Sequence, residues 1–191
     1  MTDVYGLILA GGKSERMGRD KALLPFHGMP QREFLFQMLS SVCTRVFTSC
    51  RNDQQVPVQL HPIVDQLSLH SPLNGILSAM SVYPTKAWLT VPVDMPLVTS
   101  DTIQVLINER DPSCVATCFY DSDGVEPEPL LTIWEPSAFE PLQDYQRRGG
   151  FSPKKFLQRQ KVKLLRVPDP KMLTNINTLE EWNVWLANNT G

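Results

Sequence analysis

The sequence contains no apolar run that approaches the ~20 residues needed to cross a bilayer. Its first residues lack the basic and apolar regions of a secretory signal peptide, so we expect a cytoplasmic protein with no membrane partner. The 191 residues include only four cysteines, and none of them forms a C-x-x-C pair, which argues against a zinc site. The net charge of −2 gives no reason to expect nucleic acid as a partner.

Repeats, low-complexity segments and linkers are also missing. A chain of 191 residues is long enough to bury roughly 70% of its unfolded surface, so we expect a single domain over residues 1–191. Small buried thiols are the expected state of Cys114 and Cys118, which fall in a strand-like run.

Strand-like runs alternate with helical ones along most of the chain. The expected strands are 4–10, 45–50, 62–65, 87–93 and 113–119, and the expected helices are 30–42, 73–82 and 100–109. This alternation predicts an α/β fold, a Rossmann-like three-layer αβα sandwich with a mostly parallel sheet. Residues 130–134 indicate a late antiparallel strand. Ser100 is expected to cap one helix, and Thr178 to cap a helix over 179–187 with Glu181 at the capping-box position.

The first expected strand runs into a glycine pair, Gly11 and Gly12, followed by a loop with four cations. These are Lys13, Arg16, Arg19 and Lys21. Glycines at a strand end let backbone N–H groups approach an anion closely, and cations on the same loop neutralise it, so the loop is expected to bind phosphate. The spacing fits neither the Walker A loop nor the Rossmann G-x-G-x-x-G pattern. The alternative is a plain glycine turn with solvated charges around it.

The pattern L-A-G-G-x-S-x-R-M-G-x-D-K-x-L-L-P, unbroken from Leu9 to Pro25, resembles the nucleotidyltransferase family that includes molybdenum cofactor guanylyltransferase. The resemblance implies a fold like that of nucleotide-diphospho-sugar transferases. It also implies that Arg16 and Lys21 are catalytic. The residues it assigns to nucleotide binding are Leu9, Ala10, Gly11, Gly12, Lys21, Asp65, Gly75 and Asp94. A Leu-Ala-Gly-Gly turn is associated with guanine, and Leu-Ala-Ala-Gly with cytidine.

Asp94 ends the apolar run 89–93, and Pro96 stops the strand just beyond it. A carboxylate at the mouth of a parallel sheet, facing a triphosphate, is a suitable Mg²⁺ ligand. The resembled family has its magnesium-binding aspartate in this D-x-P context, so Asp94 is the expected metal ligand and a catalytic residue. The expected cofactor is Mg²⁺, with Mn²⁺ as a substitute. The alternative is an aspartate that caps the following turn.

A middle segment resembles the family's D-x-L and G-P-L-x-G motifs, which line its nucleotide pocket. Asp65 and Gly75 match, whereas Ser71 replaces the first glycine. Ser49 and Arg51 stand where the family often has an asparagine that contacts the nucleotide. The plainer interpretation of Asn74 and Gly75 is a turn that starts a helix.

Charge separates along the last third of the chain, with seven acidic and no basic residues in 121–144 and eight basic and no acidic residues in 147–166. These charges either pair with each other or attract a phosphorylated acceptor. The segment 149–157 resembles the family's G-x-x-S-x-x-x-F-L helix, which supports Lys154 as an acceptor-binding residue. Glu126 and Glu128 have no counterpart in the resemblance.

Asn175 and Asn177 resemble the family's N-x-N-T segment near the acceptor pocket. On a short strand, alternating residues point to one face, so both asparagines are expected to bind the acceptor. Taken alone, Asn-x-Asn is usually a turn.

The resemblance implies transfer of GMP from GTP to the terminal phosphate of molybdopterin, with an N-terminal nucleotide-binding part and a C-terminal acceptor-binding part. Other cofactor-biosynthesis proteins, or a chaperone of a molybdenum enzyme, would be its protein partners. Two alternatives remain open. One is a sugar-phosphate nucleotidyltransferase of the same fold, and the other is a non-catalytic nucleotide-binding scaffold.

Overall fold

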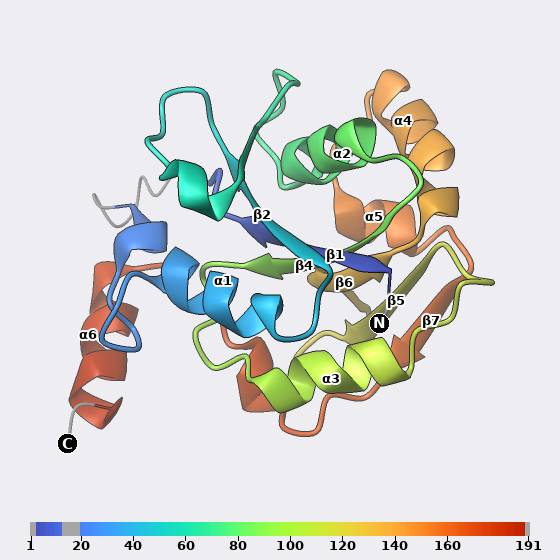
Figure 1. Cartoon of the computed structure of the whole chain (residues 1–191). Coiled ribbons are helices and arrows are strands. Elements are labelled where there is room, and N and C mark those ends of the chain that lie inside the picture. Colours follow the sequence, from blue (N-terminus) through green and yellow to red (C-terminus); the bar gives the residue numbers. More distant parts are fainter. Residues whose placement is uncertain (1–2, 13–19, 190–191) are drawn as a thin grey trace.

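A single seven-stranded sheet forms the centre of the protein in a computed structural model that describes residues 3–12 and 20–189 (Figure 1). Its strands are β1 (Val4–Leu9), β2 (Arg45–Cys50), β3 (Pro62–Val64), β4 (Ala87–Pro92), β5 (Ala116–Tyr120), β6 (Pro127–Trp134) and β7 (Val162–Leu165). Their order in the sheet is β3-β2-β1-β4-β6-β5-β7. Strand β6 runs antiparallel to β4 and β5, and the other neighbouring strands are parallel.

Helices cover both faces of this sheet, as predicted for a three-layer αβα sandwich. They are α1 (Gln31–Ser40), α2 (Leu73–Val82), α3 (Ser100–Asn108), α4 (Phe139–Arg147), α5 (Pro153–Leu157) and α6 (Leu179–Asn189). Helices α2, α4 and α5 lie on one face, and α1 and α3 lie on the other (Figure 1). Helix α6 stands at one end of the molecule, beside the start of α1.

Strand β1 shows why its sequence is a continuous apolar run. Successive side chains of a strand point to opposite faces, and here both faces are covered by helices. Val4 and Ile8 pack in the core on the side of α1 and α3, while Tyr5, Leu7 and Leu9 pack in the core on the side of α2, α4 and α5. The expected strand is therefore confirmed.

Most of the predicted elements agree with the structure to within three residues at each end, but the cap of α3 was assigned to the wrong residue. Thr99, not Ser100, is the N-cap, and its side chain accepts a hydrogen bond from the Thr102 N–H. Ser100 lies inside the first turn, where its backbone is already helical. The predicted capping box of α6 is confirmed, because the Glu181 N–H donates to Thr178 Oγ1 over 3.1 Å and the Thr178 N–H donates to Glu181 Oε2 over 3.0 Å.

Strand β5 begins at Ala116, three residues later than predicted. A turn comes first, in which the Ser113 N–H donates to the Asp111 side chain and the Cys114 N–H donates to the Asp111 carbonyl. All four cysteines are buried and free, and burial raises the pKa of the Cys118 thiol to about 12. Within the described residues, no helix has the length and apolar character to cross a membrane.

Candidate active site

Four of the predicted nucleotide-binding residues lie at the end of β1 and in the turn that follows it: Leu9, Ala10, Gly11 and Gly12. Strand β4 lies parallel to β1, with Leu9 opposite Pro92, so the segments that leave both strands meet at the carboxyl edge of the sheet. In open α/β sheets this edge is where ligands bind. Three cations of the predicted phosphate loop lie outside the described residues: Lys13, Arg16 and Arg19.

Asp94 lies at this edge, two residues beyond the end of β4. Its Oδ2 is 3.5 Å from Lys21 Nζ, and its Oδ1 is buried with no hydrogen-bond partner among the described residues. Burial raises the pKa of Asp94, and the nearby Lys21 ammonium lowers it. A buried carboxylate oxygen is costly to leave unpaired, so this atom is suited to a ligand that the protein itself does not supply.

Lys21 joins three distant segments of the chain at one point. Its ammonium is mostly buried, with 15% of the side chain exposed, and donates to Asn177 Oδ1 over 2.7 Å while facing Asp94. The Ile176 N–H donates to the Asp94 carbonyl over 2.8 Å, which fixes the segment before α6 against the end of β4. A lysine, an aspartate and an asparagine that are far apart in sequence are therefore in contact.

The segment that carries Asn177 is held by a small hydrophobic cluster separate from the two main cores. Leu24, Phe26 and Ile176 form its buried part, and Trp182 and Trp185 of α6 pack against it. The rings of Phe26 and Trp185 meet edge to face, with centroids 5.0 Å apart. Because Lys21 and Phe26 flank the same short stretch, packing of α6 helps to hold Lys21 in place.

Gly11 is a position of the turn after β1 where a side chain would be too close to a neighbouring residue. A Cβ built on it would lie 2.7 Å from Asp65 Oδ2, which is too close for a real contact. Asp65 is fixed there because Ser49 Oγ donates to its Oδ1 over 2.7 Å. Burial raises the pKa of Asp65, while the Ser49 hydroxyl and Arg51 lower it. An alanine at position 11 would displace this carboxylate.

Gly75 lies on the other side of the same hydroxyl group. A Cβ on Gly75 would overlap Ser49 Oγ and would lie 3.0 Å from Ser49 Cβ, so a larger residue would push Ser49 away from Asp65. The predicted nucleotide-binding residues Asp65 and Gly75 are thus joined to the glycine turn through Ser49. Contact of Asp65 and Gly75 with a nucleotide stays a prediction.

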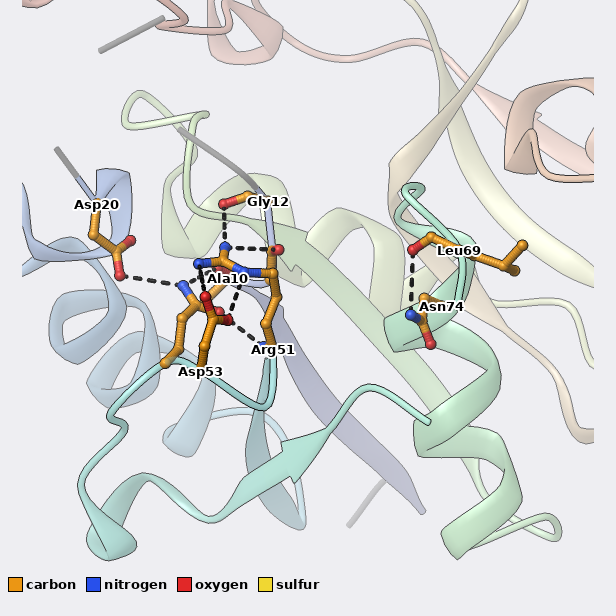
Figure 2. Close-up of polar contacts among 9 residues, drawn as sticks. Ala10, Gly12, Asp20, Arg51, Asp53, Leu69 and Asn74 are labelled. Atoms are coloured by element: carbon orange, nitrogen blue, oxygen red, sulfur yellow. Dashed lines mark hydrogen bonds and ion pairs between the residues drawn. The ribbon is translucent and has the colours of Figure 1, made fainter. Parts of the chain in front are cut away.

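Ser71 and Asn74, which surround the modified G-P-L-x-G motif, hold neighbouring loops in place. Ser71 Oγ donates to the Phe151 carbonyl and thereby joins the start of α2 to the segment before α5. The Asn74 side chain accepts from the Leu67 N–H over 2.9 Å and donates to the Leu67 carbonyl. It also donates to the Leu69 carbonyl over 3.3 Å (Figure 2). The prediction of a helix-start turn at Asn74 and Gly75 is confirmed, with loop anchoring as its structural purpose.

Lys154 is paired with an acidic residue in this structure. Its Nζ donates to Asp121 Oδ2 over 2.7 Å, and Gln158 Nε2 donates to Glu126 Oε2 over 2.6 Å. The interpretation that the acidic and basic segments pair with each other is therefore confirmed for Lys154 and Asp121. Acceptor binding by Lys154 stays a prediction, and it would require the acceptor to compete with Asp121.

The prediction of a short strand through Asn175 and Asn177 is wrong. The segment 174–177 belongs to no strand, since only the Ile176 N–H bonds to the β4 segment and the capping box of α6 starts at Thr178. Asn175 is exposed, whereas Asn177 is partly buried against Lys21. The two asparagines therefore have different surroundings, and their binding of an acceptor stays a prediction.

Glu128 lies at the same edge, although the sequence offered no role for it. Glu128 lies near the start of β6 and is mostly buried. Its Oε1 accepts a hydrogen bond from the Leu130 N–H over 2.9 Å. Burial raises the pKa of Glu128, and Asp94 and Asp121 raise it further, while the Leu130 N–H and Lys154 lower it. Antiparallel pairing of β6 with β4 brings this carboxylate near Asp94, which one sequence alone could not reveal.

The chemistry of these residues fits a divalent cation that also binds substrate. The described residues contain no group of three histidine, cysteine, aspartate or glutamate side chains that could hold a metal by themselves. Mg²⁺ usually takes one or two protein carboxylates and completes its shell with phosphate oxygens and water. Asp94 Oδ1, which has no hydrogen-bond partner among the described residues, is suited to a site where phosphate oxygens and water supply the other ligands.

A parallel sheet with a glycine turn, a buried lysine and a carboxylate at its carboxyl edge defines a nucleotide-binding α/β protein. The chain belongs to the MobA-like NTP transferase domain family, whose model matches residues 6–164. It is a nucleotidyltransferase, as are its named relatives.

Relatives named for the biosynthesis of the molybdenum cofactor or for its guanylyl transfer are similar over nearly the whole chain. The chain is 34% identical over 184 residues to the molybdenum cofactor biosynthesis bifunctional protein of Synechocystis sp.. That match covers 95% of this chain but 53% of the relative, so the chain spans about half of that protein's length. The molybdenum cofactor guanylyltransferase of Cupriavidus metallidurans is 29% identical, over 94% of this chain and 92% of the relative.

Solved structures share the fold. The molybdopterin-guanine dinucleotide biosynthesis protein A of Archaeoglobus fulgidus has a TM-score of 0.80 at 22% identity, covering 97% of this chain and 98% of that chain. The 2-C-methyl-D-erythritol 4-phosphate cytidylyltransferase of Thermus thermophilus has a TM-score of 0.70 at 12% identity, covering 97% and 98%. Proteins of this fold are therefore named for different nucleotides and acceptors. The fold alone does not determine which substrates a protein uses.

Proposed function

We propose that this protein transfers GMP from GTP to the terminal phosphate of molybdopterin, forming molybdopterin guanine dinucleotide and pyrophosphate. The observation that carries the proposal is the buried Asp94, with one unpartnered oxygen, beside Lys21 and the glycine turn. The choice of guanine and molybdopterin is supported by the names of the relatives and by the Leu-Ala-Gly-Gly turn.

In the proposed reaction, a phosphate oxygen of the acceptor attacks the α-phosphorus of GTP in line, and pyrophosphate leaves. A phosphate dianion is already nucleophilic near neutral pH, so the protein needs no general base. Catalysis then consists of positioning and of charge stabilisation. The backbone N–H groups of the turn at Gly11 and Gly12 bind the triphosphate, and the Lys21 ammonium stabilises the negative charge that develops on it.

Asp94 is the residue proposed to hold Mg²⁺, with Mn²⁺ as a substitute. When bound there, the ion would neutralise charge on the phosphates of the two substrates. The protein supplies the carboxylate and a partly buried setting in which it is already oriented. Arg16 keeps its proposed catalytic role, which depends on a segment outside the described residues.

Purified protein incubated with MgCl₂, molybdopterin and either GTP or CTP tests this proposal. We expect pyrophosphate and the guanine dinucleotide from GTP, and much less product from CTP. Release of pyrophosphate only with a hexose phosphate as acceptor would instead identify a sugar-phosphate nucleotidyltransferase. Nucleotide binding without release with either acceptor would identify a non-catalytic scaffold.

A further inference from the structure

The four-residue turn after β2 contacts both ends of the loop that follows β1. Arg51 Nη1 donates to the carbonyls of Gly11 and Gly12, over 3.2 and 2.9 Å. Gln54 Nε2 donates to the Ala10 carbonyl over 3.0 Å and to Asp20 Oδ2 over 3.2 Å. Figure 2 shows the Arg51 side chain between Gly12 and Asp53, with Ala10 beside it and Asp20 farther to the left.

The turn is itself rigidly built, so its side chains have little freedom to leave the loop. The Arg51 N–H donates to Gln54 Oε1 over 2.8 Å, and the Gln54 N–H donates to the Arg51 carbonyl over 3.1 Å. Asp53 accepts from Arg51 Nε over 2.9 Å and from Nη2 over 3.4 Å, which fixes the plane of the guanidinium. This fork leaves Nη1 pointing at the loop carbonyls.

Fixing a carbonyl also fixes the N–H of the same peptide unit. In a trans peptide the C=O and the N–H point in opposite directions, so binding of the Gly11 carbonyl by Arg51 turns the Gly12 N–H away from Arg51. Among the described residues, a Cβ at Gly12 would meet nothing within 4 Å. The donor is therefore oriented in advance, which is how backbone amides bind an anion.

We propose that Arg51 and Gln54 are positioning residues for the nucleotide: they act through the loop backbone and do not contact the phosphates. The inference rests on the proposed nucleotidyl transfer. It extends that function by assigning substrate affinity to a turn outside the loop itself.

The test compares Arg51→Ala, Arg51→Lys and Gln54→Ala with two matched controls. Arg45→Ala removes an exposed arginine at the opposite end of β2, and Gln55→Ala removes the exposed glutamine next to Gln54. Steady-state kinetics give KM for GTP with Mg²⁺ and kcat separately. Hydrogen exchange of the backbone at residues 9–12 and 20–24 reports on the two ends of the loop without depending on turnover.

We expect Arg51→Ala and Gln54→Ala each to raise KM for GTP about tenfold, the effect of losing a charge-assisted or paired hydrogen bond, with a smaller change in kcat. Both should exchange faster at residues 9–12, and the double variant should be less than additive because both residues hold one loop. Arg51→Lys should recover little, since an ammonium cannot bind Asp53 and two carbonyls as a planar fork does. The control variants should behave like the wild type.

Two results would overturn the proposal. The first is wild-type KM and exchange in Arg51→Ala. The second is a large defect in Arg51→Ala while both Gln54→Ala and Arg51→Lys keep full activity. That result would mean that the positive charge at position 51 acts directly on the phosphates. A wild-type protein that binds GTP but transfers nothing would refute the proposed function, and the exchange and GTP-binding measurements would still decide whether the turn positions the loop.

Discussion

Buried carboxylates have different partners in the two halves of the sheet, the half formed by β1 to β4 and the half formed by β5 to β7. In the first half, Asp94 Oδ1 is buried at the carboxyl edge and has no hydrogen-bond partner within residues 3–12 and 20–189. In the second half, Glu135 has a side chain that is 2% exposed, and both of its oxygens accept from Arg110, over 2.6 and 2.7 Å. Asp121 likewise accepts from Lys154.

This difference distinguishes a carboxylate that is available to a ligand from carboxylates that are paired within the protein. A buried ion pair that is fully hydrogen-bonded is complete within the protein, and removing one partner would leave the other charge uncompensated. An unpaired buried oxygen is tolerated where a ligand from outside the protein supplies its missing partner. The unpaired oxygen therefore lies in the half that holds the proposed nucleotide site, whereas Glu135 and Asp121 of the second half are paired within the protein.

The largest expected effect is that of Asp94→Asn. The variant should lower the rate of GMP transfer by about 10³-fold or more, because a bound metal ion contributes several kcal/mol to phosphate chemistry and an amide binds it poorly. Pyrophosphate release at saturating GTP measures the loss. Asp101→Asn, an exposed aspartate on α3, is the matched control. Wild-type turnover in Asp94→Asn would remove Asp94 from the catalytic site.

Lys21→Ala should have the next largest effect, a loss on the order of 10²–10³ in kcat, by analogy with the loss of one transition-state donor. The same assay measures it, with Lys171→Ala as an exposed control. Asn177→Ala should reproduce part of this defect, since it removes the oxygen that accepts from Lys21. If Lys21→Ala turns over at the wild-type rate, the ammonium has no catalytic role.

Lys154→Ala tests whether the second half also binds substrate. Internal pairing predicts that KM for the acceptor changes by less than about threefold, because the pair with Asp121 is partly exposed and such pairs contribute little. A rise of about tenfold or more, with KM for GTP unchanged, would show that Lys154 leaves Asp121 to bind the acceptor.

The smallest expected effect concerns stability. Because burial raises the pKa of Glu128 above the ordinary value of 4.5, its ionised form is less favourable in the folded chain than in the unfolded one. At neutral pH, Glu128→Gln should therefore raise the free energy of unfolding. The difference should shrink as the pH falls through the raised pKa and disappear below 4.5. Urea unfolding of both proteins from pH 4 to pH 8 measures it, and a difference that grows on acidification would contradict it.

Much of the fold was predictable because local patterns determine it. The alternation of apolar runs with amphipathic helices predicted the layers, and β2 (Arg45–Cys50) and α2 (Leu73–Val82) have the predicted bounds. The capping residues Thr178 and Glu181 lie three positions apart, so their hydrogen bonds are encoded locally. The cap at Thr99 was missed because Thr99 and Ser100 are both suitable N-cap residues and the helix could begin after either.

The site was predictable only in part. Strand ends in a parallel sheet meet at one edge, so the glycine turn and Asp94 could be placed together from sequence. The partners of these residues could not be. Asn177 reaches Lys21, and Gln54 reaches Asp20, across long stretches of chain that no local pattern connects.

The sequence by itself determined the class of fold, the glycine turn and the carboxylate after β4, because each depends on neighbours within a few residues. The tertiary structure alone decided which charges pair, which oxygen stays unpartnered and which turn holds the loop. Those outcomes depend on distances between segments that meet only after the sheet has assembled, and on burial, which sets how much an unpaired charge costs.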